Sequence, residues 1–180
     1  MLDALKHRTI IIGNSGSGKS TLATRISEIC GCQHVRLDEI YWVDQRCLKK
    51  RGQADAQQMA LALSQEPQWV IEGVFGWLVE LVSPRATMLI WLDLPWSECE
   101  TGLISRGPVH GTTENEFNDL VAWAHLYWER RTSSSYAAHA RIYEAFEGQK
   151  LRVRARLEVN ALCALIGWNT TVELRRVHSQ

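Results

Sequence analysis

The sequence lacks the features that would direct it to a membrane or to a charged polymer. Its 20 lysines and arginines balance 20 aspartates and glutamates, so no overall field attracts it to nucleic acid or to an anionic membrane. No apolar run approaches the roughly 20 residues that span a bilayer, and no signal-type segment precedes the first predicted strand. We therefore expect a cytoplasmic protein with no membrane partner and no direct nucleic-acid partner.

Cysteine chemistry and repeated sequence are also scarce. The five cysteines are an odd number and include no Cys-x-x-Cys pair. Cys30-x-Cys32 has no second ligand pair to complete a metal site, so free thiols in a reducing compartment are the simpler interpretation. The chain has no repeat, linker or low-complexity tract, and 180 residues suffice for one domain with a continuous core. We expect a single domain over residues 1–180.

What the sequence does contain is a glycine-rich phosphate-binding pattern between a predicted strand, 9–12, and a predicted helix, 21–30. Glycines let successive backbone N–H groups turn toward phosphates, and the helix N-terminus adds partial positive charge. Lys19 would reach the β- and γ-phosphates, and the Ser20 hydroxyl would hold Mg²⁺. The pattern predicts binding of a nucleoside triphosphate. The predicted binding residues are Gly13, Asn14, Ser15, Gly16, Ser17, Gly18, Lys19, Ser20 and Thr21.

Further apolar runs alternate with helical patterns along the chain. Because these runs are continuous, they indicate strands buried on both faces of a parallel sheet. The predicted strands are 9–12, 34–37, 69–71, 87–92 and 151–153, and the predicted helices are 21–30, 55–65, 75–82, 95–106, one from the Thr113–Glu116 capping box, 136–147 and 156–166. The alternation predicts an α/β fold with a doubly wound parallel sheet. The last segment, 169–180, is either an extra strand or a loose tail.

Three acids follow predicted strands, at the edge where such sheets bind ligands. Asp38 either binds or deprotonates a phosphate acceptor, or caps the next helix. Glu72 precedes Gly73, where a carboxylate would hold Mg²⁺ through water. Asp93 has the position of a metal-binding acid, but we favour a cap for the helix that begins near Pro95.

Arginines frame a segment that we expect to move. Arg106 ends one predicted helix, and Arg130 and Arg131 end the next one. The segment between them, about 107–135, could close over ATP and exclude water. The alternative is that arginines at helix C-termini only stabilise the helix dipole.

The acceptor side offers weaker signals. The basic run 46–51 lies between the second and third strands, and it either contacts the acceptor or forms a solvated face. Tyr41 and Trp42 either stack on a ring of the acceptor or pack in the core. Residues 154–156 follow the last strand and therefore reach the same edge of the sheet.

With these residues in place, the chain resembles the adenylate-kinase-like P-loop kinases, and among them the bacterial DNA-topology-modulation kinases. The matching stretches are 11–22, 37–42, 69–73, 90–95 and 136–160. Neither the charge balance nor a motif supports direct DNA binding.

The resemblance implies a five-stranded parallel core, an acceptor-binding insert over about 38–68 and an arginine-bearing lid over about 107–135. It also implies that Asp38 faces the acceptor and that Arg106 contacts ATP. The chain departs from the family pattern in two ways. Glu72 stands where aspartate is more frequent, and the helix before the lid carries one arginine where relatives often have several.

Three functions are compatible with these residues. The first is an ATP- and Mg²⁺-dependent small-molecule kinase, with a nucleoside monophosphate as the preferred acceptor class. The second is a kinase for a hydroxyl-bearing metabolite, in which Asp38 is a general base because an alcohol must lose its proton. The third is an NTP-hydrolysing switch that acts through a partner. ATP is favoured over GTP by resemblance alone, and the oligomeric state is left open.

Overall fold

The computed structural model describes residues 7–44, 49–108 and 111–177, with side chains placed as far as residue 166. Five parallel strands form one sheet in the order β2-β3-β1-β4-β5. They are β1 (Arg8–Gly13), β2 (Gln33–Arg36), β3 (Trp69–Gly73), β4 (Met88–Leu92) and β5 (Gln149–Val153). The doubly wound parallel sheet predicted from the sequence is confirmed, including the number of strands.

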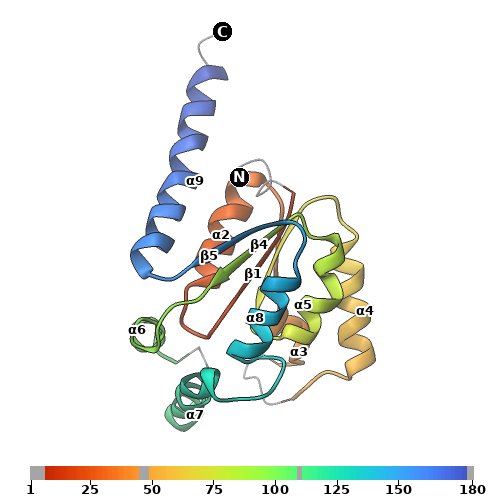
Figure 1. Ribbon diagram of the computed structural model, residues 1–180, viewed down its shortest axis with the longest axis vertical. Helices are drawn as coiled ribbons and strands as arrows, with labels where there is room; N and C mark the ends of the chain where they lie inside the picture. The colour runs from red at the N-terminus through yellow and green to blue at the C-terminus, as the bar shows by residue number, and fades with distance from the viewer. Residues whose placement is uncertain (1–6, 45–48, 109–110, 178–180) are drawn as a thin grey trace.

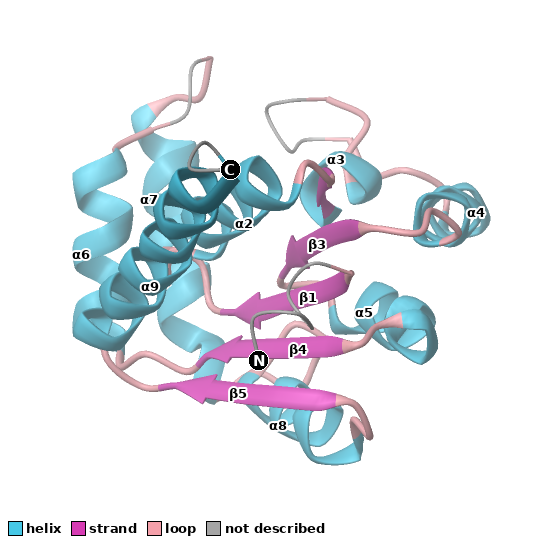
Figure 2. Cartoon of the chain, turned by 90° about the horizontal axis from the view of Figure 1, so that it is seen from above, coloured by secondary structure: helices cyan, strands magenta, loops and turns pink. Residues whose placement is uncertain are grey.

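Helices cover both faces of the sheet (Figures 1 and 2). One face carries α2 (Lys19–Cys30) and α9 (Arg156–Val177), and the other carries α4 (Gln53–Ser64), α5 (Gly76–Val82) and α8 (Tyr136–Ala145). The remaining elements are α3 (Leu37–Tyr41), η1 (Ser83–Arg85), α6 (Trp96–Arg106), α7 (Glu114–His125) and η2 (Leu126–Trp128). Helices α6 and α7 lie beyond the carboxyl ends of the strands (Figure 1). This arrangement leaves the loop after β1 between the sheet and these two helices.

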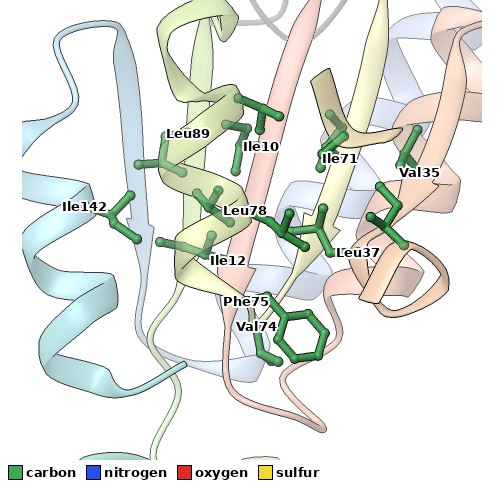
Figure 3. Packing of buried hydrophobic residues seen from close by; sticks show 14 of the residues in the cluster. Ile10, Ile12, Val35, Leu37, Ile71, Val74, Phe75, Leu78, Leu89 and Ile142 are labelled. Atoms are coloured by element: carbon green, nitrogen blue, oxygen red, sulfur yellow. The ribbon is translucent and has the colours of Figure 1, made fainter. Parts of the chain in front are cut away.

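The alternation of side chains along β1 divides the core into two layers. Ile10 and Ile12 pack with Leu78 and Ile142 on the face covered by α5 and α8 (Figure 3). Ile11 points to the opposite face and packs with apolar residues of α2 and α9. Each such fully buried side chain contributes about 1.5–3 kcal/mol relative to an exposed one. Burial on both faces therefore fixes β1 in the centre of the sheet, and with it the start of the following loop.

Local signals set the starts of two helices, and the first of them is the predicted capping box. The Thr113 hydroxyl accepts a hydrogen bond from the Glu116 N–H (3.2 Å), and the Glu116 carboxylate accepts one from the Thr113 N–H (2.7 Å). Ser135 caps α8 by accepting from the Ala138 N–H at 3.2 Å. Both caps satisfy N–H groups that have no partner within the helix.

The C-terminal segment differs from the prediction. Residues 169–177 are neither a strand nor a loose tail, because they continue α9 as a helix that extends well beyond the sheet (Figure 1). The predicted helix ended at Ile166, because no periodic apolar pattern continues beyond that residue.

Candidate active site

The glycine-rich loop lies between β1 and α2, at the centre of the sheet edge. Gly16 and Gly18 have φ angles of 78° and 97°, in the left-handed region that residues with a Cβ rarely adopt. Gly18 is also the N-cap of α2, so the first N–H groups of the helix open onto the loop. The structure therefore has the backbone form expected of an anion-binding loop.

Lys19 is held inside this loop. Its side chain is buried, and Nζ donates a hydrogen bond of 2.8 Å to the Asn14 carbonyl. Burial lowers the pKa of Lys19, an effect that Glu72 and Asp38 oppose and that Arg106 reinforces. The ammonium group is thus desolvated and poised to gain from an anionic ligand.

Ser20 and Glu72 form the adjoining polar pair. The Ser20 hydroxyl donates to Oε1 of Glu72 at 2.7 Å, and Glu72 is 2% exposed at the end of β3. Burial alone would raise the pKa of Glu72, but His34, Lys19 and the Ser20 hydroxyl together lower it. Nε2 of His34 lies 3.9 Å from Oε1, beyond direct hydrogen-bond distance. A hydroxyl beside an ionised carboxylate supplies the hard oxygen atoms that Mg²⁺ prefers.

Asp38 lies in the first turn of α3. Arg36 occupies the N-cap position, so the alternative that Asp38 caps the helix is wrong. The Asp38 residue is exposed. Desolvation by the surrounding protein and the charge of Glu72 nevertheless raise the pKa of its carboxyl group, and the charges of Lys19, Arg106 and Arg36 oppose that rise. The charge interactions bring Asp38 into the same electrostatic cluster as Lys19 and Glu72.

The three predicted arginines have different surroundings. Arg106, the last residue of α6, is exposed, and its charge acts on both Lys19 and Asp38. Arg131 is exposed as well. Arg130 instead donates to the carbonyls of Trp123 and Ser134 and stacks over the Trp123 ring at 3.6 Å. Burial lowers the pKa of Arg130 to about 10, and its contacts join the last turn of α7 to the segment before α8.

The end of the predicted lid is tied to the core by buried hydrogen bonds. Nδ2 of Asn14 donates to the Ala124 carbonyl at 2.9 Å. The Tyr127 hydroxyl meets Nδ1 of His139 at 2.7 Å, and Nε2 of His139 donates to the Val74 carbonyl at 3.0 Å. The shared ring fixes the tautomer, because Nε2 must carry the proton when it faces a carbonyl. Burial lowers the pKa of His139 to about 3, which keeps the ring neutral.

Asp93 does not cap α6 but pairs with an arginine. Its Oδ2 accepts from Nε and Nη2 of Arg152 at 2.9 and 2.8 Å. Pro95 occupies the N-cap of α6, so the expected capping role is wrong. Arg152 also lies over the Trp91 ring at 4.2 Å. The partner comes from the neighbouring strand β5, a pairing that follows from the sheet order and not from local sequence.

On the acceptor side, packing explains most of the predicted residues. The Tyr41 ring stacks on Phe75, with centroids 4.1 Å apart, and meets Trp42 edge to face. Nε of Arg51 donates to the Ile40 carbonyl at 2.8 Å, at the end of α3. Lys49 and Lys50 are exposed. The rest of the basic run, residues 46–48, lies outside the described residues.

One residue of the site was not assigned from the sequence. Arg156, the first residue of α9, donates from Nη1 to the Ser17 carbonyl and from Nη2 to the Gly16 carbonyl, both at 2.8 Å. The sequence places 154–156 at this edge but gives no sign of which arginine binds the loop. The contact joins residues about 140 positions apart.

Two features are absent from the residues that the structure describes. In the described part of the chain, no helix is long and apolar enough to cross a membrane. Within that same part, no group of three or more His, Cys, Asp or Glu side chains is arranged to hold a metal ion.

No protein-family model and no curated protein matches the sequence. Several solved structures, however, are similar to this chain in fold. The chain is similar to a shikimate kinase from Bacteroides thetaiotaomicron, at 16% identity and a TM-score of 0.54, over 89% of this chain and 96% of that one. A gluconokinase from Sinorhizobium meliloti 1021 gives 13% identity, a TM-score of 0.54 and 96% coverage of both chains. The chain therefore shares the fold of these two kinases.

A third structure extends the comparison. A sugar kinase from Janibacter sp. HTCC2649 matches at 12% identity and a TM-score of 0.51, over 87% of this chain and 89% of that one. At these identities the likeness concerns the fold. The resemblance to DNA-topology-modulation kinases stays a prediction from the sequence.

Proposed function

We propose that this protein is an ATP- and Mg²⁺-dependent kinase that phosphorylates a hydroxyl group of a small metabolite. The observation that carries the proposal is that Lys19 and Glu72 are buried, with Ser20 bonded to Glu72, and that the exposed Asp38 interacts electrostatically with both charges. The first three suit a nucleotide triphosphate with its metal. Asp38 suits the acceptor, because its carboxylate is accessible and is held by no helix cap.

The roles of the donor-side residues follow from their contacts. The N–H groups of residues 13–21 would bind the phosphates, and Lys19 would neutralise charge that develops during transfer. Ser20 and Glu72 would hold Mg²⁺, Glu72 through water. The bound Mg²⁺ would supply charge neutralisation on the phosphate oxygens. Arg106 and Arg131, at the two ends of the lid segment, would reach the phosphates when the segment closes.

Asp38 would act as the general base. The acceptor oxygen attacks the γ-phosphorus, its O–H proton passes to Asp38, and ADP leaves. A raised pKa makes Asp38 a stronger base than an ordinary carboxylate. The base must be ionised, so the rate is expected to fall as pH decreases through that raised value.

The preferred acceptor class therefore changes from a nucleoside monophosphate to an alcohol. The solved structures with this fold are named for shikimate, gluconate and sugars, all of which carry hydroxyl groups. A phosphate acceptor has no comparable proton to lose, so it would leave Asp38 without a chemical role.

A transfer assay tests the proposal. The protein is incubated with γ-labelled ATP, Mg²⁺ and a panel that contains hydroxy-metabolites and nucleoside monophosphates. Lys19→Ala is the inactive variant, and Arg141→Ala, an exposed arginine on α8, is the control. Label on an alcohol in the wild type and in Arg141→Ala alone supports the proposal. Label on a nucleoside monophosphate would instead show a nucleotide acceptor. Release of free phosphate alone would favour an NTP-hydrolysing switch.

A further inference from the structure

We propose that Arg156 is a positioning residue that holds the phosphate loop in its binding shape by gripping the outer side of that loop. The inference rests on the proposed nucleotide binding and deepens it. It assigns to the first residue of α9 a part in catalysis that acts through the loop and not through contact with the reacting atoms.

The guanidinium group fits the outside of the loop at two adjacent carbonyls. Nη1 donates to the Ser17 carbonyl and Nη2 to the Gly16 carbonyl, each at 2.8 Å. Nη2 also reaches the Glu98 carbonyl at 3.2 Å. A planar fork with several fixed donors can hold two such carbonyls at once, which a single ammonium cannot do in the same geometry.

The backbone of Arg156 is fixed as well. Its N–H donates to the Glu98 carboxylate, so the start of α9 is attached to α6. Glu98 therefore binds Arg156 twice, through its carboxylate and through its main-chain carbonyl. The arginine has a defined position from which to hold the loop.

Because of peptide-bond geometry, hydrogen bonds to carbonyls on the outer side of the loop also orient N–H groups on its inner side. In a planar trans peptide, the C=O of one residue and the N–H of the next point in opposite directions. Fixing the Gly16 and Ser17 carbonyls outward therefore directs the N–H groups of Ser17 and Gly18 inward. The Ser17 N–H indeed points at the Asn14 carbonyl (3.3 Å), the same atom that accepts from Nζ of Lys19. The inner side of the loop is thus the side of the catalytic lysine.

The phosphate loop also packs closely against α6. A Cβ added to Gly102 of α6 would lie 2.2 Å from the Gly16 carbonyl oxygen and 3.2 Å from Nη2 of Arg156. A Cβ on Gly16 would lie 2.1 Å from the Cys99 carbonyl oxygen. The loop backbone therefore packs directly against the backbone of α6, and the Arg156 guanidinium lies beside this contact.

Loss of the arginine should weaken binding of phosphates and leave binding of the nucleoside unchanged. Without donors, the two carbonyls no longer hold the Ser17 and Gly18 N–H groups inward, and the ligand must order them itself. We expect Arg156→Ala to bind MgATP and MgADP about ten- to a hundredfold more weakly. Arg156→Lys should lie between the wild type and the alanine variant, because it keeps the charge and loses the fork.

The test is calorimetric titration of the full chain with MgATP, MgADP and adenosine. Arg141→Ala is the control for loss of an exposed arginine. The expected result is weaker binding of both nucleotides by Arg156→Ala, equal binding of adenosine, and recovery of nucleotide affinity on addition of methylguanidine. If Arg156→Ala proves unfolded by circular dichroism, Arg156→Lys decides by the same comparison.

Three results would overturn the inference. Wild-type affinity for MgATP in the folded variants would show that the loop needs no grip. Equal loss of adenosine and nucleotide binding would show a general structural role. Failure of the wild type itself to bind MgATP would refute the proposed function, and this inference with it.

Discussion

The two sides of the candidate site are built differently. On the donor side, Lys19 and Glu72 are buried and each is held by a hydrogen bond shorter than 3 Å. By contrast, Asp38 on the acceptor side and the lid arginines Arg106 and Arg131 are exposed. A rigid donor side suits a ligand whose phosphates are always the same, and an open acceptor side suits closure around a second substrate. The difference predicts that substitutions on the donor side change the Mg²⁺ dependence and nucleotide binding, whereas substitution of Asp38 changes the pH dependence.

The largest effect is expected for Lys19→Ala. Removal of the buried ammonium should lower kcat by about 10²–10³-fold, because charge on the transferred phosphoryl group loses its nearest cation. The melting temperature should not fall, since burial already disfavours the charged lysine in the folded state. Steady-state transfer assays and thermal denaturation measure the two quantities. Unchanged kcat would show that the loop is not the donor site.

Asp38→Asn should lower kcat with an alcohol acceptor by about 10²-fold. The pH dependence gives the sharper test: the wild-type rate should fall in acid, and the residual rate of the variant should be nearly flat. A raised folded-state pKa means that ionised Asp38 destabilises the fold at neutral pH. The variant should therefore melt about 1–2 °C higher at neutral pH, and the difference should vanish in acid. A parallel acid limb in both proteins would assign the titration to another group.

Glu72→Gln should raise the Mg²⁺ concentration that gives half of the maximal rate about tenfold, with a smaller change in kcat at saturating metal. The amide keeps the shape and can still accept from the Ser20 hydroxyl, but it removes the ionised carboxylate. Titration of the rate with Mg²⁺ measures the shift. An identical metal dependence in variant and wild type would remove Glu72 from the metal site.

Gly102→Ala should weaken nucleotide binding about fivefold, corresponding to about 1 kcal/mol of crowding against the loop. The added methyl group has to displace either the Gly16 carbonyl or the α6 backbone. Titration with MgATP measures the effect. Exposed Ser105→Ala on the same helix is the matched control.

The smallest effect on turnover is expected for Arg130→Met, which should instead lower stability by about 2 kcal/mol. Two carbonyls lose their donors and the Trp123 ring loses its stacking partner. The exposed neighbour Arg131 provides the opposite case: Arg131→Met should leave the melting temperature unchanged and raise KM for ATP. Equal melting of both variants would contradict the structural role of Arg130.

Local sequence predicted the donor side well. The phosphate loop, Lys19 and Ser20 form one contiguous motif, and Glu72 stands at the end of a continuous apolar strand, so position alone indicates its edge of the sheet. The three central strands were found for the same reason, since apolar runs mark buried parallel strands, whereas the edge strands β2 and β5 are largely exposed and have a weaker apolar signal.

Contacts between distant parts of the chain were not predictable in this way. Asp93 was expected at a helix cap, but Arg152 of the adjacent strand is its partner. Arg156 binds a loop 140 positions earlier, and no local pattern distinguishes it from its neighbour Arg154. Such pairs depend on strand order and helix docking, which the sequence pattern constrains only as a class.

The most direct test of the central claim is the chemical nature of the bond that receives the label from γ-labelled ATP. A phosphate ester of an alcohol survives acid treatment, whereas the phosphoanhydride of a nucleoside diphosphate is hydrolysed by it. We predict acid-stable label in the wild type and its near absence in Lys19→Ala and Asp38→Asn. Acid-labile label that Asp38→Asn still produces at the wild-type rate would contradict the assignment of a hydroxyl acceptor and of Asp38 as its base.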